Sequence, residues 1–338
     1  MTLDQAVALS LVENLPRVGL TARLLESDPE LLDLAESLVE RGRAERIRAA
    51  RAGIGVLAWN DPLMPLALVA ISDAPPALWY RGSLDCLKQP AVAIVGSRAA
   101  SSVAIETARR LATDLAALSI TVVSGLARGV DSAAHRGALE TGRTVAVLGS
   151  GIDYIYPSEH KGLAMQIALS GLVVSEYPPG TPPLQFHFPM RNRLISGLSR
   201  AVVVIEASDK SGSLITASCA AEQGRDVMAV PGNVLSGRNK GGHALIRDGA
   251  KIVECADDIV AELGFGPPVS LNATAASDKG STSSEDPVLR RMDTACAYDI
   301  DALAAVCGLD APRLLPHLAD LELRGLVRRV GGGRFMRQ

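Results

Sequence analysis

A short glycine-containing segment follows the apolar run at residues 91–95. It consists of Gly96, Ser97 and Arg98, and a helical pattern begins a few residues later. A strand that ends in glycine and turns into a helix directs free N–H groups, and the positive end of the helix dipole, at a bound anion. Arg98 adds a permanent charge on a planar group that suits a phosphate. We therefore predict a phosphate seat at these three residues.

A second segment of this kind follows the apolar run at residues 201–205. Ser211, Gly212 and Ser213 stand just before a helical stretch, with Thr216 one turn inside it. Small hydroxyls and a glycine at a helix start form an anion cradle, and two cradles predict two adjacent phosphates. The G-x-G-x-x-G fingerprint of nicotinamide binding and the G-x-x-x-x-G-K-[ST] loop of ATP binding are absent. We therefore expect no such cofactor.

Aromatic, basic and amide side chains gather between residues 186 and 193. We expect Phe186 to offer its face to a base. Arg191 and Arg193 would neutralise phosphates, and Asn192 would hold the loop or contact a base edge. Each phenylalanine of the segment could equally fill the core beneath it. This mixture favours a single-stranded nucleic acid as the ligand.

Two further basic residues flank these segments. Arg128 lies in the glycine-rich stretch 124–131, and Lys240 lies in the basic, glycine-rich stretch 237–242. Glycine permits tight loops that expose backbone donors. We expect both side chains to contact the same polyanion from the rim of the site.

Other polar residues have alternative interpretations that the sequence leaves open. Capping of the following helix is the favoured role of Asp131, and a packed position is favoured for His135. Glu206 stands at a strand end and could act as a general acid or base, although a structural carboxylate is favoured. The two arginines of segment 186–193 could pair with Glu206 or Glu176 instead of phosphates.

Six apolar runs rich in β-branched residues alternate with helical stretches. They cover residues 92–95, 121–123, 144–148, 172–174, 201–205 and 226–230. This alternation predicts an α/β fold with a Rossmann-like parallel sheet and helices on both of its faces. The candidate residues follow the carboxyl ends of the runs, where open α/β sheets bind ligands, so we expect one shared site.

Changes of pattern divide the chain into domains. We expect a small helical domain at 1–58, a Rossmann-like domain at 59–263, a Pro/Ser/Thr-rich linker at 264–286 and a C-terminal winged-helix domain at 287–338. Residues 15–19 resemble the hairpin of helix-hairpin-helix modules. The winged helix rests on helical spacing near 288–297, 301–307 and 312–324, followed by a hairpin around a glycine turn at 331–333.

Charge and composition restrict the classes of function. The 338 residues carry a formal net charge of −3, a pI of about 6.0 and 3% aromatic residues. These values exclude a protein that coats nucleic acid with bulk charge or with an extended stacking surface. The five cysteines have no metal-binding spacing, so we expect no metal site. No signal peptide or membrane-spanning run is evident, and we expect a cytoplasmic protein without membrane contact.

Taken together, the motifs resemble those of the DprA/Smf (DNA-processing protein A) family. They are, in chain order, IVGSR (94–98), SGLARGVD (124–131), YP (156–157), SEYP (175–178), FPMRNR (188–193), SGSLITA (211–217) and VPG (230–232). The resemblance covers about residues 60–255. It implies an extended Rossmann-like fold, a homodimer, and a protein that binds single-stranded DNA without being an enzyme.

The resemblance also implies a biological role and a second surface. Members of the family protect incoming DNA and load the RecA recombinase onto it during natural transformation. The dimer and RecA surface would follow the last strand, at Leu245, Ile246, Arg247 and Ile252. The DNA pocket carried over by motif comprises residues 96–98, 191–193 and 211–213.

Two other functions remain open from the sequence. Rossmann-like nucleotide phosphoribohydrolases bind a nucleoside monophosphate in a comparable loop, but the glutamate of their P-G-G-x-G-T-x-x-E motif has no counterpart after Thr216. A regulator could instead bind duplex DNA through the winged helix, where residues 287–338 hold eight arginines and six acidic residues. Binding of single strands, duplexes or nucleoside monophosphates separates the three alternatives.

Overall fold

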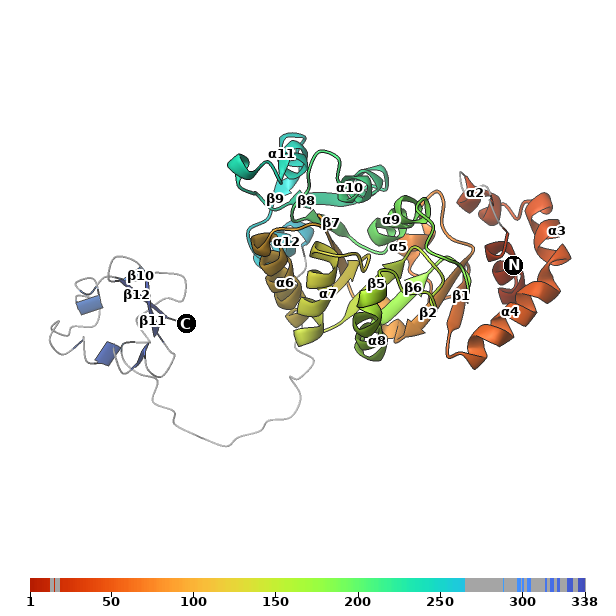
Figure 1. Cartoon of the computed structure of the whole chain (residues 1–338), viewed down its shortest axis with the longest axis horizontal. Coiled ribbons are helices and arrows are strands. Elements are labelled where there is room, and N and C mark those ends of the chain that lie inside the picture. The colour runs from red at the N-terminus through yellow and green to blue at the C-terminus, as the bar shows by residue number, and fades with distance from the viewer. Residues whose placement is uncertain are drawn as a thin grey trace, which may run out of the picture. The chain divides into compact units, whose positions relative to one another are not determined.

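The structure is a computed structural model of the chain (Figure 1). It describes residues 1–12, 15, 19–264, 288, 297–298, 300, 303–304, 314, 317–318, 321–322, 327–330 and 334–337. The chain forms two compact units, Met1–Val269 and Ser270–Gln338, and each is described by itself. Among the described residues, no helix has the length and apolar character that crossing a membrane requires.

A nine-stranded sheet forms the centre of the first unit, in the order β1-β2-β6-β5-β4-β3-β7-β8-β9. The strands are β1 (Gly55–Ala58), β2 (Ala77–Gly82), β3 (Ala91–Val95), β4 (Thr121–Ser124), β5 (Thr144–Leu148), β6 (Leu172–Ser175), β7 (Ala201–Val204), β8 (Asp226–Ala229) and β9 (Lys251–Ile252). From β6 to β9 in this order, neighbouring strands are parallel, as predicted. Strands β1 and β2 extend the sheet as an antiparallel edge that the apolar runs did not indicate.

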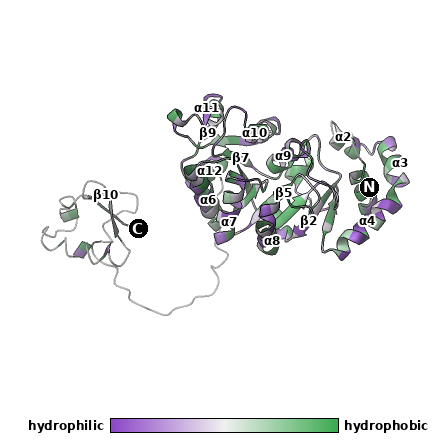
Figure 2. Cartoon of the chain, in the orientation of Figure 1, coloured by the Kyte–Doolittle hydropathy of each residue, from purple (hydrophilic) through white to green (hydrophobic). Residues whose placement is uncertain are grey.

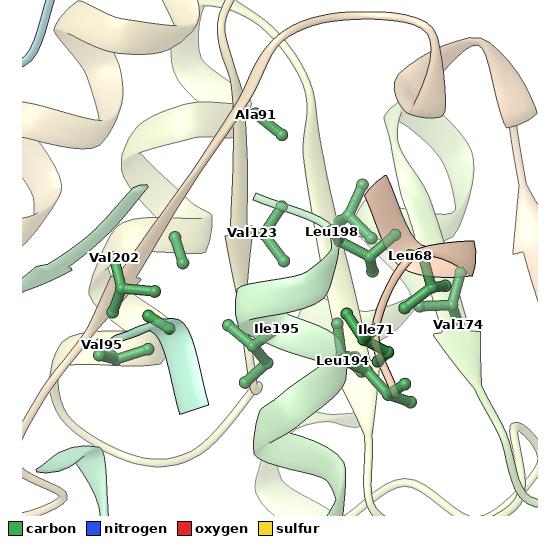
Figure 3. Close-up of a cluster of buried hydrophobic side chains, with 14 of the residues drawn as sticks. Leu68, Ile71, Ala91, Val95, Val123, Val174, Leu194, Ile195, Leu198 and Val202 are labelled. Atoms are coloured by element: carbon green, nitrogen blue, oxygen red, sulfur yellow. The ribbon is translucent and has the colours of Figure 1, made fainter. Parts of the chain in front are cut away.

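Helices cover both faces of this sheet. They are α5 (Leu66–Val69), α6 (Ser102–Ala117), α7 (Val130–Thr141), α8 (Lys161–Ser170), α9 (His187–Gly197), α10 (Ser213–Glu222), α11 (Lys240–Arg247) and α12 (Ala256–Leu263). On one face, Ile195 of α9 packs in a cluster with Val95 and Val202 (Figure 3). On the other face, α6, α7 and α12 share a cluster with Val92 and Ile94. Because both faces are covered, the central strands β3, β5 and β7 are buried at every position and mostly apolar, and β5 is green in Figure 2.

Four helices precede the sheet and lie at its β1 edge (Figure 1). They are α1 (Leu3–Ser10), α2 (Leu20–Leu25), α3 (Pro29–Ser37) and α4 (Val39–Arg51). Val7 of α1 and Ala49 of α4 belong to the same buried cluster as Trp79 of β2. The first compact unit therefore extends across the domain boundary predicted at residue 58. Most of the segment 15–19, with its helix-hairpin-helix resemblance, lies outside the described residues.

The second unit contains a three-stranded sheet in the order β10-β12-β11. Strand β10 covers Ala297–Tyr298, β11 covers Val327–Val330 and β12 covers Arg334–Arg337. The pairing of β11 with β12 is antiparallel and confirms the predicted hairpin. Val327 and Phe335 are buried with leucines from described helical positions. Most residues of the three predicted helices lie outside the described part of the chain.

Candidate functional site

A cavity of about 410 Å³ opens at the carboxyl ends of β3 and β7. The strand order reverses there, because the chain continues from β3 to β4 on one side and from β7 to β8 on the other. Loops that leave neighbouring strands in opposite directions create a crevice, where open α/β folds bind ligands. The cavity walls come from the loop after β3 and from the first turns of α7, α9 and α10.

The loop after β3 places Ser97 and Arg98 in the cavity wall. A Cβ on Gly96 would lie 2.6 Å from Val130 Cγ2 and 3.1 Å from the backbone carbonyl oxygen of Glu206, so this position requires glycine. The Ser97 N–H donates to the same carbonyl oxygen at 2.7 Å. The loops after β3 and β7 are thus joined by their backbones. Arg98 is exposed and forms no ion pair with any described residue.

The start of α6 is already occupied by a carboxylate of this chain. Glu206 is 7% exposed, and it accepts hydrogen bonds from the Ser101 N–H at 3.1 Å and from the Ser101 hydroxyl at 2.7 Å. The Ser101 hydroxyl oxygen in turn accepts from the Ala104 N–H. A negative charge therefore stands at the positive end of the helix dipole, where a phosphate was expected. The contacts support the structural alternative for Glu206.

The start of α10 is open by comparison. No side chain caps the helix at Gly212, and Ser213 and Thr216 line the cavity from its first turn. The Ser211 and Ser213 hydroxyls lie 2.7 Å apart. Asn192 donates to the Gly212 carbonyl oxygen at 3.3 Å and so ties α9 to this loop. The first-turn N–H groups have acceptors within the chain, because the Ser213 N–H donates to the Ser211 hydroxyl oxygen at 3.4 Å, and the Leu214 and Ile215 N–H groups donate to the Ser211 and Gly212 carbonyl oxygens at 3.1 and 3.3 Å. Unlike the start of α6, this start has no carboxylate as an acceptor, so the positive end of its dipole faces the cavity.

Residues 187–193, interpreted from the sequence as a loop, form the first turns of α9. Pro189 is tolerated there because the first turn of a helix needs no backbone N–H donor at that position. Residues three and four apart share a helix face, whereas residues two apart do not. Phe188, Arg191, Asn192 and Ile195 accordingly line the cavity together.

Arg191 is a buried cation in the cavity wall, with 3% of its surface exposed. Its Nη1 donates to the Val147 carbonyl oxygen, while its Nε has no hydrogen-bond partner among the described residues. The guanidinium packs on Gly125, where a Cβ would lie 2.1 Å from Nη1. Burial lowers the pKa of Arg191 to about 10, although the nearby Asp131 carboxylate opposes this change. The residue remains cationic at neutral pH and has an unused donor.

Arg193 lies outside the cavity wall, unlike the expectation from the sequence. It is 5% exposed, its Nη2 lies 2.6 Å from Glu176 Oε2, and its Nε lies 3.0 Å from Asp73 Oδ2. This is the internal ion pair that the sequence left open as an alternative. Because Arg193 is two residues from Arg191 on a helix, the two side chains leave α9 in different directions.

Phe188 supplies the aromatic wall of the cavity, and Phe186 does not line it. Arg98 Cζ lies 5.6 Å from the centre of the Phe188 ring, within cation–π range. Phe186 is 61% exposed and packs edge-on against His187, with ring centres 4.5 Å apart. The sequence could not separate the two phenylalanines without the phase of α9.

The predicted rim residues Arg128 and Lys240 are exposed and do not line the cavity. Both oxygens of the Glu159 carboxylate accept hydrogen bonds from Arg128, at 2.6 and 2.8 Å. Arg238, which the sequence placed only in a basic stretch, donates to the Ala99 carbonyl oxygen at 3.1 Å. It therefore adds a positive charge beside Arg98 that was not among the predicted site residues.

Asp131 and His135 have structural roles. Asp131 accepts hydrogen bonds from the N–H groups of Gly125 and Ala127 at 3.1 and 3.4 Å, and burial raises the pKa of its carboxyl group. It therefore holds the loop before α7, whereas capping of α7 was predicted. His135 is fully buried, its Nδ1 lies 2.8 Å from the Thr144 hydroxyl, and burial lowers its pKa to about 3. It is a packed, neutral histidine, as the favoured interpretation had it.

The predicted dimer and RecA surface follows β8. Leu245 packs on the core from α11, and its neighbours Ile246 and Arg247 end the same helix. Ile252 is 52% exposed on the edge strand β9. Within the described part of the chain, no cluster of His, Cys, Asp and Glu has the arrangement of a metal site.

The fold and the cavity define an extended Rossmann-like α/β protein with a cationic cavity at the reversal of strand order. The sequence profile of DNA recombination-mediator protein A matches residues 55–264, and that of the DprA winged helix domain matches residues 272–333. The chain belongs to the DprA/Smf family, as its motifs indicated.

Curated relatives and solved structures agree with this assignment. DprA of Streptococcus pneumoniae R6 is 49% identical over 206 residues, which cover 61% of this chain and 73% of that protein. Smf of Escherichia coli K12 is 40% identical over 280 residues, which cover 81% of this chain and 75% of that protein. The X-ray structure of S. pneumoniae DprA matches 78% of this chain and 98% of its own at a TM-score of 0.67 and 38% identity. A Helicobacter pylori DprA structure, described for its single-stranded DNA binding mode, matches 63% and 96% at a TM-score of 0.58 and 29% identity.

Proposed function

We propose that the cavity binds the sugar-phosphate backbone of single-stranded DNA. The observation that carries the proposal is Arg191, a guanidinium in the cavity wall that is 3% exposed and has an Nε without a partner among the described residues. A buried charge with an unused donor is costly unless an anion meets it. Arg98 at the rim and the open start of α10 face the same space, so they can bind neighbouring phosphates of one chain.

A single strand suits this cavity better than a duplex. The phosphates of duplex DNA lie on a stiff surface, whereas a single strand can bend its backbone toward a recessed cation. An unpaired base can also stack on Phe188, which forms one wall beside Arg98. The described binding of single-stranded DNA by the H. pylori relative supports this choice. Because the cavity offers charges and backbone donors, binding should depend little on sequence and weaken with salt.

The family assignment supports a place for this binding in DNA recombination. We propose that the protein protects incoming single strands and loads the RecA recombinase onto them during natural transformation, without catalysis. A homodimer through α11 and β9 would join two cavities on one strand and raise avidity. The exposed Ile252 and the outer edge of β9, which pairs with no strand in the described part of the chain, support such an interface.

The proposal predicts the effect of Arg98→Ala on DNA binding. Fluorescence anisotropy of labelled single-stranded and duplex oligonucleotides, across a salt series, measures it. We expect wild type to prefer the single strand, and the substitution to weaken that binding by roughly tenfold and to reduce the salt dependence by about one phosphate. Removing a charge from an exposed side chain should leave the stability of the fold unchanged.

Arg110→Ala is the matched control, because Arg110 is an exposed arginine of α6 that does not line the cavity. It should bind DNA like wild type. Equal affinity for duplex and single strand, or equal losses for the two substitutions, would contradict the assignment of the cavity. Displacement of the oligonucleotide by a nucleoside monophosphate at comparable concentration would favour the phosphoribohydrolase alternative.

A further inference from the structure

A second aromatic ring continues the cavity wall beyond Phe188. The centre of the Tyr156 ring lies 5.4 Å from that of Phe188, at an interplanar angle of 43°. Arg98 Cζ lies 5.6 Å from the centre of the Phe188 ring, so Phe188 contacts both the Arg98 guanidinium and the Tyr156 ring. Tyr156 is 47% exposed and belongs to none of the buried clusters among the described residues. Its position is that of an accessible surface, in a chain with few aromatic residues.

An ion pair involves Glu159, three residues after Tyr156 in the chain. Arg128 and Glu159 are joined by two hydrogen bonds, with side chains 59% and 51% exposed. Glu159 raises the pKa of Arg128, chiefly through these hydrogen bonds. Because Glu159 follows Tyr156 by three residues, this pair ties Arg128 to the chain segment that carries the ring. An exposed pair of this kind contributes little to stability, so a phosphate can replace the carboxylate at low cost.

We propose that Tyr156 and Arg128 form a second nucleotide subsite, which receives the strand as it leaves the cavity past Phe188. This inference rests on the proposed binding of single-stranded DNA. The base of the emerging nucleotide stacks on Tyr156. Its phosphate displaces the Glu159 carboxylate and binds the Arg128 guanidinium. The exposed face of a ring accepts any base, so the subsite lengthens the footprint without adding sequence specificity.

The test compares two ligands of equal length, a labelled oligothymidylate and an oligonucleotide with the same backbone and no bases. Tyr156→Ala should weaken oligothymidylate binding by roughly five- to tenfold, as the loss of one base–aromatic stack does. It should leave binding of the abasic strand unchanged. Tyr156→Phe keeps the ring and should bind both ligands like wild type.

Tyr154→Ala is the matched control, since Tyr154 is 50% exposed in the same loop and, unlike Tyr156, makes no ring contact with Phe188. It should change neither affinity. Equal losses on both ligands for Tyr156→Ala would show an effect on the loop and overturn the stacking subsite. No loss on either ligand would overturn it too, and the Arg98→Ala result would then stand by itself. If wild type fails to bind the single strand, both proposals fail.

Discussion

Helices α6 and α10 begin in similar ways beside the same cavity, yet they treat an incoming anion differently. Each follows a parallel strand through a loop of small residues, and each appeared in the sequence as a phosphate seat. At α6 the position is filled, because Glu206 accepts two hydrogen bonds from Ser101. At α10 the first-turn N–H groups donate to the Ser211 hydroxyl and to backbone carbonyl oxygens, no carboxylate joins them, and this helix start lines the cavity together with Arg191.

The difference shows that a glycine before a helix does not by itself create an anion site. The α6 loop uses its glycine to pack, because Gly96 touches Val130 and the backbone of Glu206. The α10 loop has free space at Gly212, where a Cβ would meet nothing within 4 Å. The start of α6 is therefore neutralised by a carboxylate of the fold, whereas the positive end of α10 lies beside the cavity without one.

The largest effect on DNA affinity is expected from Arg191→Met, which removes the buried cation from the cavity wall. Affinity for single-stranded DNA should fall by about thirtyfold or more, the value of a charge-assisted hydrogen bond lost from a dry site. The substitution also removes the donor to the Val147 carbonyl oxygen and the cation beside the buried Asp131, so the free energy of unfolding should fall by about 1–3 kcal/mol. Anisotropy and urea denaturation measure the two quantities.

Arg193→Met on the same helix is the counterpart. It breaks the ion pair with the buried Glu176 carboxylate and should therefore lower the free energy of unfolding by about 3 kcal/mol or more. The fraction that remains folded should bind DNA like wild type. A loss of affinity in both variants with stability intact would mean that both arginines bind DNA, contrary to the two roles that α9 gives them.

The phase of α9 explains why the sequence did not separate these arginines. Charged and aromatic residues after a strand could be predicted to gather at one sheet edge, and they do. Which side chains enter the cavity depends on where the helix begins, and residues 186–193 were interpreted as a loop. Once α9 starts at His187, Phe188 and Arg191 share a face, while Arg193 turns toward Glu176.

The occupant of the α6 start could not be predicted for another reason. Glu206 and Ser101 are 105 positions apart, and only the reversal of strand order between β3 and β7 brings them together. No local pattern encodes such a contact. The central parallel strands were predictable because both faces of the sheet are covered, so that these strands are mostly apolar and rich in β-branched residues. The edge strands β1, β2 and β9 were missed. The first two are largely apolar but stand outside the alternation of parallel strands with helices, and β9 has only two residues.

Alanine substitutions at Gly96 and Gly212 test the difference between the loops before α6 and α10, and we expect effects of intermediate size. Gly96→Ala should lower the free energy of unfolding by about 2 kcal/mol, because the methyl group meets Val130 and the backbone of the β7 loop. Gly212→Ala should change stability by less than about 0.5 kcal/mol, since its φ of −62° suits alanine and the space is open.

Gly212→Ala should weaken DNA binding, because the added methyl group occupies space at the start of α10. The methyl group of Gly212→Ala stands where a phosphate approaches the α10 N–H groups, so affinity should fall roughly fivefold, about 1 kcal/mol. Thermal denaturation and anisotropy on both variants give the two results. An unchanged affinity for Gly212→Ala would move the phosphate away from the start of α10 and toward Arg98.

The smallest effect on DNA affinity is expected from Glu206→Gln, which directly tests the role of the carboxylate at the start of α6. Glutamine keeps one acceptor oxygen for the Ser101 N–H, replaces the other oxygen by an NH2 donor, and removes one negative charge beside the cavity. Affinity for single-stranded DNA should therefore rise about threefold at low salt, and the gain should shrink as salt screens the charge. Glu222→Gln removes the same charge at the exposed far end of α10 and should bind like wild type. A lower affinity for Glu206→Gln would instead mean that the carboxylate positions the loop after β3 for binding, and that the filled helix start contributes to the site through Ser97 and Arg98.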